Sequence, residues 1–205
     1  MKTPIGKDRG VNHMIQQGGR VLLLSSMVLL AACSGESADT LLASAKKHIE
    51  NKDSKAAVIQ LKNALQNDPS LPEAGFLLGK LQLESGDVVG ANVELQKALE
   101  RGYDADKLAP TLAKAMLAAG EAEKLIKQFA DRTLPQPKAQ SELRLTLAAA
   151  YLAKGRLDEG RAALAEALRS DPANIAAQLL QVRMLASSRD LPAAKDYLAQ
   201  VIKSA

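Results

Sequence analysis

The stretch AGFLLGKLQLESGDVVGANVELQKAL, residues 74–99, carries the pattern that decides the fold. Each of its halves places apolar residues three or four positions apart, which lines up one apolar stripe on each of two helices. Between the halves, Gly86 can take the left-handed conformation that ends the first helix, and Asp87 can cap the second. The stretch therefore predicts a helical hairpin. Because a lone hairpin leaves an apolar face uncovered, it also predicts neighbouring hairpins.

The same pattern recurs along the chain every 34 residues, with one step of 35. The large apolar position of the second helix is held by Leu61, Leu95, Phe129, Leu164 and Leu198. The position four residues earlier is held by Ala57, Ala91, Leu125, Gly160 and Ala194. A mostly small position of the first helix is held by Ala45, Gly79, Ala113, Ala148 and Val182. Five units in one register favour a repeat architecture over a generic helical bundle.

This helix-turn-helix pattern resembles the tetratricopeptide (TPR) repeat. One unit carries the resemblance at Leu78, Gly79, Gly86, Ala91, Leu95 and Ala98, and another at Ala148, Tyr151, Gly155, Leu164, Ala167 and Pro172. The resemblance implies an all-α fold, a right-handed TPR superhelix, or solenoid, of about five repeats.

We place the TPR domain at residues 40–205, with repeats near 38–71, 72–105, 106–140, 141–174 and 175–205. The third repeat is expected to begin near Asp106, with Pro110 in its first turn, where the missing N–H costs least. Its second helix, from Glu121 to about Arg132, is the least regular. The segment Leu134-Pro135-Gln136-Pro137 then predicts a rigid break and a local bend. Repeat four is expected from about Ser141.

Residues 1–32 are typical of an export signal, in which a positive segment ending at Arg20 precedes the apolar run 21–32. The run ends in Leu30-Ala31-Ala32-Cys33, which resembles a bacterial lipobox. That resemblance implies cleavage between Ala32 and Cys33, lipid attachment to the Cys33 thiol, and acylation of the new amino group. An uncleaved anchor and an ordinary signal with a stray cysteine are the alternatives. Residues 33–39 would form a lipidated tether.

Ser34 follows the lipobox cysteine and resembles the class of lipoproteins sorted to the outer membrane of Gram-negative bacteria. Translation could start at Met1 or at Met14, and either start gives the same mature protein. We therefore expect a protein lipid-anchored in the outer membrane and facing the periplasm.

The formal charge of +4 overstates how basic the mature chain is. Residues 1–32 hold four basic residues and one acidic residue, so only +1 remains after their removal. This balance leaves no basic footprint for nucleic acid. Apolar residues make up 47% of the chain but aromatic residues only 2%, which suits closely packed helices.

The sequence offers little catalytic chemistry. His13 lies in the expected signal, so the mature chain keeps only His48, for which we expect a packing or solvent role. No serine has a plausible base, no histidine or acidic cluster has metal-ligand spacing, and no phosphate-binding glycine motif occurs. We expect no enzyme activity, metal or cofactor.

Without catalytic chemistry, the sequence predicts that the protein acts through a binding surface. In TPR arrays the first helices line the concave groove, and the residue after the small packing position points into it. Those residues here are Lys46, Lys80, Lys114, Ala149 and Arg183. A row of cations in such a groove would favour an acidic ligand, although exposed lysine is also simply a good helix former. Apolar patches of the same groove are expected from Leu42, Ile49, Phe76, Leu83, Leu117, Leu145, Leu152 and Leu179.

A lipobox followed by this TPR sequence, from about Leu29 to Leu117, resembles the TPR lipoproteins of the PEP-CTERM/exosortase system. The phrases AAVIQLKNALQNDP and LAPTLAKAMLAAG carry the similarity. The resemblance implies a scaffold for envelope protein partners, linked to exopolysaccharide production or surface-protein export. The alternatives are a pilus or secretin assembly factor and a non-catalytic subunit of a polysaccharide-processing enzyme. Those TPR lipoproteins are much longer, with many more repeats.

The fifth repeat has an apolar second helix, and no polar capping helix follows it. Its apolar residues are Leu191, Ala194, Leu198 and Val201. Terminal repeats normally need a polar cap for solubility. This predicts either self-association through the last repeat or a longer chain.

Overall fold

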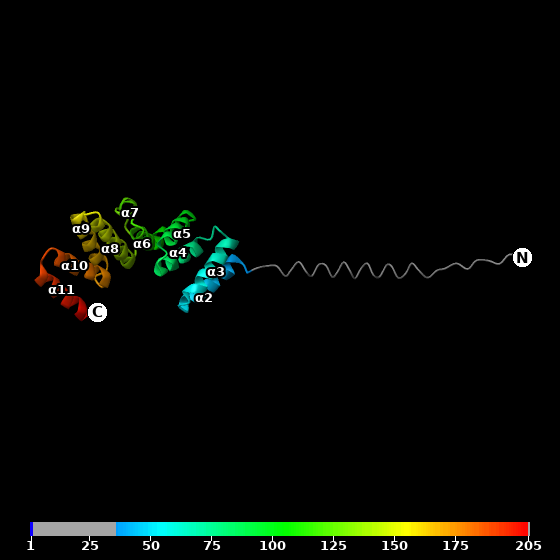
Figure 1. The fold of residues 1–205 in the computed structure, drawn as a ribbon, viewed down its shortest axis with the longest axis horizontal. Helices are drawn as coiled ribbons and strands as arrows, with labels where there is room; N and C mark the ends of the chain where they lie inside the picture. Colours follow the sequence, from blue (N-terminus) through cyan, green and yellow to red (C-terminus); the bar gives the residue numbers. More distant parts are fainter. Residues whose placement is uncertain (2–35, 205) are drawn as a thin grey trace. The chain divides into compact units, whose positions relative to one another are not determined.

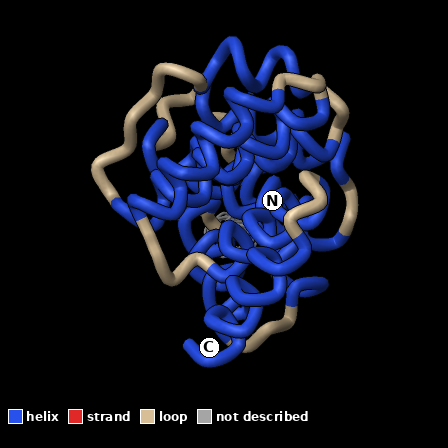
Figure 2. Tube along the Cα trace, turned by 90° about the vertical axis from the view of Figure 1, so that its left-hand side faces the viewer, coloured by secondary structure: helices blue, strands red, loops and turns tan. Residues whose placement is uncertain are grey.

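The computed structural model describes Met1 and residues 36–204, and all structural statements concern these residues. The expected signal, its cleavage site and Cys33 lie outside them. The described residues from Ala38 onwards belong to one compact unit of helices without strands (Figures 1 and 2). The all-α prediction is confirmed. No helix in this part of the chain is long and apolar enough to cross a membrane.

The helices of residues 36–204 follow one another as five hairpins. They are α2 (Ala38–Glu50) with α3 (Ser54–Asn67), α4 (Pro72–Ser85) with α5 (Val88–Glu100), α6 (Ala105–Ala118) with α7 (Ala122–Phe129), α8 (Pro137–Ala153) with α9 (Leu157–Ser170), and α10 (Ile175–Ser187) with α11 (Leu191–Ser204). Each first helix packs on its own second helix, and neighbouring hairpins are joined by contacts such as those of α3 with α4, α5 with α6 and α6 with α8. The first helix of the chain's opening hairpin begins at Ala38, inside the expected tether.

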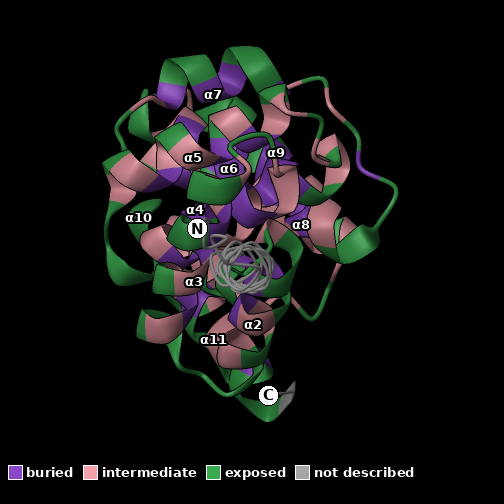
Figure 3. Cartoon of the chain, turned by 90° about the vertical axis from the view of Figure 1, so that its right-hand side faces the viewer, coloured by how far each residue is buried: buried purple, intermediate pink, exposed green. Residues whose placement is uncertain are grey.

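The register positions form the core, as the repeat pattern predicts. Ala45, Gly79, Ala113 and Ala148 are buried on the first helices, and Leu61, Leu95, Phe129 and Leu164 on the second. At Gly79 the two helices of the hairpin approach closely, because an added β-carbon would stand 2.7 Å from Leu95 Cγ. Figure 3 shows this distribution of burial, with buried residues where helices face one another and exposed residues along their outer sides.

The inner turns are made as their residues predict. Gly86, Gly120 and Gly155 have positive φ angles of 88°, 76° and 75°. Asp87 accepts a hydrogen bond from the Gly90 backbone N–H at 3.0 Å, which caps α5. Each hairpin therefore closes over a turn of very few residues.

The expected place of Pro110 is wrong. Asp104 accepts backbone hydrogen bonds from Asp106 and Lys107 at 3.0 and 3.2 Å, so α6 already starts at Ala105. Pro110 consequently lies inside the helix rather than in its first turn. The helix gives up one N–H donor there, and the buried ring contributes to the core instead.

The third repeat is shorter than predicted at its second helix. α7 ends at Phe129 rather than near Arg132, and α8 starts at Pro137 rather than near Ser141. Arg144 of α8 fills the gap, since its guanidinium donates to the carbonyls of Ala130 and Arg132 at 2.7 and 3.0 Å. The segment between the two helices is thereby tied to α8.

The last hairpin is the least buried. Ala177 is the buried residue of α10, while Ile175 and Leu179 are 43% and 44% exposed. Leu191 and Ile202 of α11 are more exposed still, at 65% and 70%. The register positions Val182 and Leu198 are only half-buried here.

We predict that Gly79→Val lowers the free energy of unfolding by about 1–3 kcal/mol, because the new side chain has no room beside Leu95. Chemical denaturation followed by circular dichroism measures the change. Glu84→Val, at an exposed position of the same helix, is the control and should stay within about 0.5 kcal/mol of the parent. Equal losses in both variants would mean that the close approach at Gly79 does not limit packing.

Candidate functional site

The predicted cations lie on four of the five first helices. Lys46 is on α2, Lys80 on α4, Lys114 on α6 and Arg183 on α10. We call the side of the hairpins formed by α2, α4, α6, α8 and α10 the inner surface. Lys80, Lys114 and Arg183 are exposed, and Lys46 is half-buried.

Two of these cations are paired with acidic residues of the next first helix. Lys46 Nζ lies 2.7 Å from Glu73 Oε1, and Lys114 Nζ lies 2.6 Å from Glu142 Oε2. Both pairs are partly exposed, so each contributes only about 0–1 kcal/mol to stability. The pairs matter more for binding than for stability, because a lysine that already pairs with a carboxylate attracts an acidic ligand less strongly.

The spacing of these pairs explains why Lys80 differs. Glu73 follows Lys46 by 27 residues, and Glu142 follows Lys114 by 28, the extra residue being the step of 35 in the repeat. The position 27 residues after Lys80 is held by another cation, Lys107. Within residues 36–204, Lys80 has no ion-pair partner. The acidic residues that decide this pattern were missed at the sequence level, although their spacing was readable.

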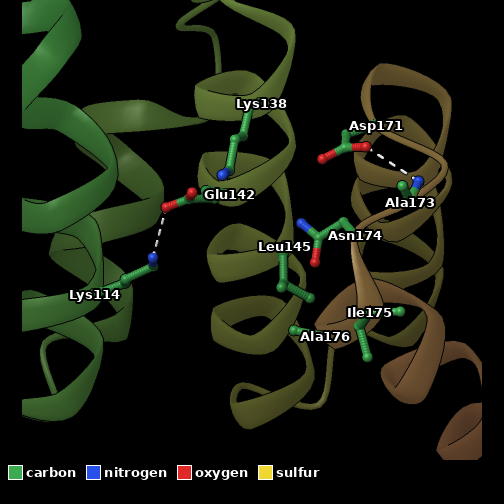
Figure 4. A pocket seen from close by; sticks show the side chains of 9 residues that line it. All are labelled: Lys114, Lys138, Glu142, Leu145, Asp171, Ala173, Asn174, Ile175 and Ala176. Atoms are coloured by element: carbon green, nitrogen blue, oxygen red, sulfur yellow. Dashed lines mark hydrogen bonds and ion pairs between the residues drawn. The ribbon is translucent and has the colours of Figure 1, made fainter. Parts of the chain in front are cut away.

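The inner surface is hollowed between α6, α8 and the start of α10. We call this cavity of about 530 Å³ the inner pocket; it is lined by Lys114, Lys138, Glu142, Leu145, Asp171, Ala173, Asn174, Ile175 and Ala176. Figure 4 shows the two lysines on one side of it and Asp171 and Asn174 on the other. Ala149 of α8 and Ala176 of α10 are 27 residues apart, and they occupy the positions that hold the ion pairs Lys46–Glu73 and Lys114–Glu142 elsewhere. Because alanine side chains are small, they leave space for a ligand here.

The far wall of the inner pocket is fixed by hydrogen bonds. Asn174 caps α10 by accepting from the Ala177 N–H at 3.1 Å, and its Nδ2 donates to Ser141 Oγ at 2.9 Å. Asp171 accepts from the Ala173 N–H at 3.0 Å. In the described residues Lys138 makes no ion pair, and Leu145 and Ile175 supply apolar surface. The pocket therefore combines Lys138 and Asp171, neither of which makes an ion pair within the described residues, with an apolar patch.

Arg183 lines a different cavity, of about 450 Å³, with Leu152, Leu180 and Met184. No ion pair holds its guanidinium within the described part of the chain. The predicted row of cations is thus split: Lys46 and Lys114 are paired, while Lys80 and Arg183 are not.

The expected apolar groove residues also divide. Leu42 is buried in the core, whereas Leu145 and Leu179 reach the surface. Phe76 stacks on Tyr103 with ring centroids 4.4 Å apart. Burial raises the pKa of Tyr103, and the charges of Glu73 and Asp104 add to the effect. Phe76 therefore serves packing between repeats.

Among residues 36–204, no group of three or more histidine, cysteine or acidic side chains is placed to hold a metal ion. His48 lies half-buried on α2, with Nδ1 3.7 Å from Asp53 Oδ2.

No protein-family model and no curated protein matches the chain. Solved structures do match it. PilF from Pseudomonas aeruginosa superposes with a TM-score of 0.68 at 16% identity, over 82% of this chain and 76% of that one. PilW, a type IV pilus biogenesis factor, gives 0.67 at 17% identity, over 82% and 77%. YrrB, a TPR protein with an unusual peptide-binding site, gives 0.58 at 19% identity, over 82% and 86%. The chain has the all-α solenoid fold of TPR proteins.

We predict that Ser141→Ala loosens the last hairpin, because it leaves Asn174 Nδ2 without its acceptor at a part-buried site. A lost hydrogen bond of this kind costs about 1 kcal/mol, so amides of α10 and α11 should exchange with solvent about fivefold faster. Hydrogen exchange measured by mass spectrometry tests this. Ser44→Ala on α2 serves as the control, and unchanged exchange in α10 would contradict the role given to Asn174.

Proposed function

We propose that this chain is a protein-interaction scaffold that binds an extended, acidic segment of a partner protein on its inner surface. The inner pocket is the observation that carries the proposal. It offers Ile175, 43% exposed, beside Leu145, and an exposed apolar side chain in a concave site is typical of ligand contact. The peptide-binding site named for YrrB supports the same use of a related fold.

An acidic segment fits the cations that are left unpaired. Lys138 at the inner pocket, Lys80 on α4 and Arg183 on α10 have no carboxylate partner within residues 36–204. A partner carboxylate near any of them would gain a charge-assisted hydrogen bond without breaking an existing ion pair. The neighbouring apolar surface would take an apolar side chain of the same segment.

We place this scaffold at the periplasmic face of the outer membrane of a Gram-negative bacterium, anchored by lipid at Cys33. The lipobox-like segment ending at Cys33 supports this location. More than one acyl chain is needed for stable anchoring, and lipoprotein processing at the thiol and the new amino group would supply them. Within the envelope, we propose a role in PEP-CTERM/exosortase-linked exopolysaccharide production or surface-protein export, based on the resemblance of residues 29–117.

A pilus assembly factor is the second candidate. The fold likeness to PilF and to the pilus biogenesis factor PilW favours it. Both candidates share a scaffold with an inner binding surface, so only the identity of the partner separates them.

Site-specific photo-crosslinking tests the scaffold and its partner together. We predict that a photoreactive residue placed at Ile175 captures one envelope protein in living cells, and that Lys138→Glu reduces this capture severalfold because it repels the acidic segment. A photoreactive residue at Val89, 75% exposed on α5, is the matched control and should not capture that protein.

Identification of the captured protein decides between the pathways. A component of exopolysaccharide production or protein export supports the first candidate, and pilus components alone would reject it. Capture from Val89 but not from Ile175 would reject the inner surface as the binding site.

The anchor has a separate prediction. Cys33→Ala removes the only thiol of the chain, so no lipid can be attached and the protein should leave the outer-membrane fraction. Membrane fractionation with metabolic labelling by a radioactive fatty acid measures both effects. Ser34→Ala keeps the thiol and is the control. If the Cys33→Ala protein stays in the outer membrane, lipidation does not anchor it.

A further inference from the structure

A second groove lies away from the inner surface, between the second helices of the first two hairpins. It has a volume of about 340 Å³, with α3 and α5 as its walls and Leu78 of α4 at its floor. We call it the outer groove. Its other residues of interest here are Lys62 on α3, Gln82 on α4, and Lys97 and Arg101 at the end of α5. The three helices follow one another in the part coloured cyan to green in Figure 1.

Arg101 is half-buried in this groove and has no partner. Within residues 36–204 its guanidinium makes no hydrogen bond or ion pair, and its Nη1 atom is buried without an acceptor. Asp68 is close enough for the charge of Arg101 to help lower its pKa, but hydrogen bonds from Ser70 are the main cause of that shift. Both hydrogen bonds from Ser70 go to Asp68 Oδ1, and no hydrogen bond or ion pair joins Asp68 to Arg101 within the described residues.

Other arginines in the described residues show the usual outcome. Arg144 donates to two backbone carbonyls, and its Nε lies 2.9 Å from Glu166 Oε2. Arg132, Arg156 and Arg161 each pair with a carboxylate. A guanidinium nitrogen that is buried without an acceptor, as Nη1 of Arg101 is, is costly because its N–H donors have lost water without replacement. Arg101 thus marks a place where an acceptor from another molecule would be stabilised.

The groove carries excess positive charge around Arg101. Glu94 is the acidic residue in its lining, and it is already paired with Lys97 at 2.9 Å. Lys62 is exposed and has no ion pair in the described residues. Lys62 and Arg101 make no ion pair within the described residues and lie on opposite walls, which favours an anionic ligand between them.

The side-chain oxygen of Gln82 favours a peptide over a lone carboxylate ion as the ligand, because this oxygen lacks a hydrogen-bond donor. Its Nε2 donates to Asp87 Oδ2 at 3.0 Å, which leaves Oε1 buried and without a donor. A carboxylate ion has no proton to offer this oxygen, whereas a peptide backbone N–H does. Leu65, Leu78 and Pro69 add apolar surface for a side chain of the same peptide.

We propose that the outer groove binds an acidic peptide segment of a partner protein. Its carboxylate is held by Arg101 and Lys62, and its backbone N–H donates to Gln82 Oε1 once the amide turns toward the groove. This site is separate from the inner pocket and lies on other helices, so the chain could hold two partner segments at once.

Fluorescence anisotropy with the full chain tests the proposal. The probe is the labelled peptide Ala-Leu-Glu-Leu-Ala with blocked ends, together with its twin in which glutamine replaces glutamate. We expect the glutamate peptide to bind, the glutamine twin to bind about tenfold more weakly, and Arg101→Gln to weaken the glutamate peptide about tenfold. Arg169→Gln on α9 is the matched control, because it removes an exposed, unpaired arginine elsewhere, and it should leave binding unchanged.

Two further variants keep the test decisive. Lys62→Glu lies at an exposed position, so it preserves the fold even if Arg101→Gln does not, and it should also weaken the glutamate peptide. Lys138→Gln, in the inner pocket, should weaken this peptide far less than Arg101→Gln does, and a loss of binding there but not at Lys62 or Arg101 overturns the proposal. Equal affinity for the two peptides overturns it as well. Displacement of the peptide by an equimolar concentration of inorganic phosphate would reassign the groove to phosphate groups.

Discussion

At Gly79 the backbone of α4 approaches the side chain of Leu95 so closely that a β-carbon would stand 2.7 Å from Leu95 Cγ. Gly160 repeats this approach against Leu152 in the fourth hairpin, at 2.8 Å. Because the paired helices nearly touch, each hairpin becomes a thin unit whose two faces must be covered by neighbours. The order of the helices, the buried registers and the positions of both grooves all depend on this close packing.

The stacking also sets which charges remain available on the surface. Residues on successive first helices meet at a spacing of 27 or 28, so the residue at that distance decides whether a cation is paired. Where that residue is acidic, the cation is held in an ion pair, as at Lys46 and Lys114. Where it is a second cation, as after Lys80, the surface keeps its positive charge. Where both positions are alanine, the inner pocket forms beside α10.

The sequence predicted the hairpins, their glycine turns and the buried registers because these depend on contacts within one repeat. It failed at Pro110, which lies in the interior of α6 rather than in its first turn. It failed again at the end of α7, where Arg144 from the next hairpin takes the backbone carbonyls. The ion pairs of the predicted cations and the unpaired Arg101 also depend on contacts between repeats. Such contacts join residues far apart in the chain, so the local pattern cannot reveal them.

The most direct measurement is hydrogen exchange of the full chain with and without the partner captured from the inner surface. The account predicts that binding slows exchange in residues 137–145 of α8 and 173–179 at the start of α10, which border the inner pocket. Protection confined to other segments, with both of these unchanged, would contradict the claim that the inner surface is where this scaffold meets its partner.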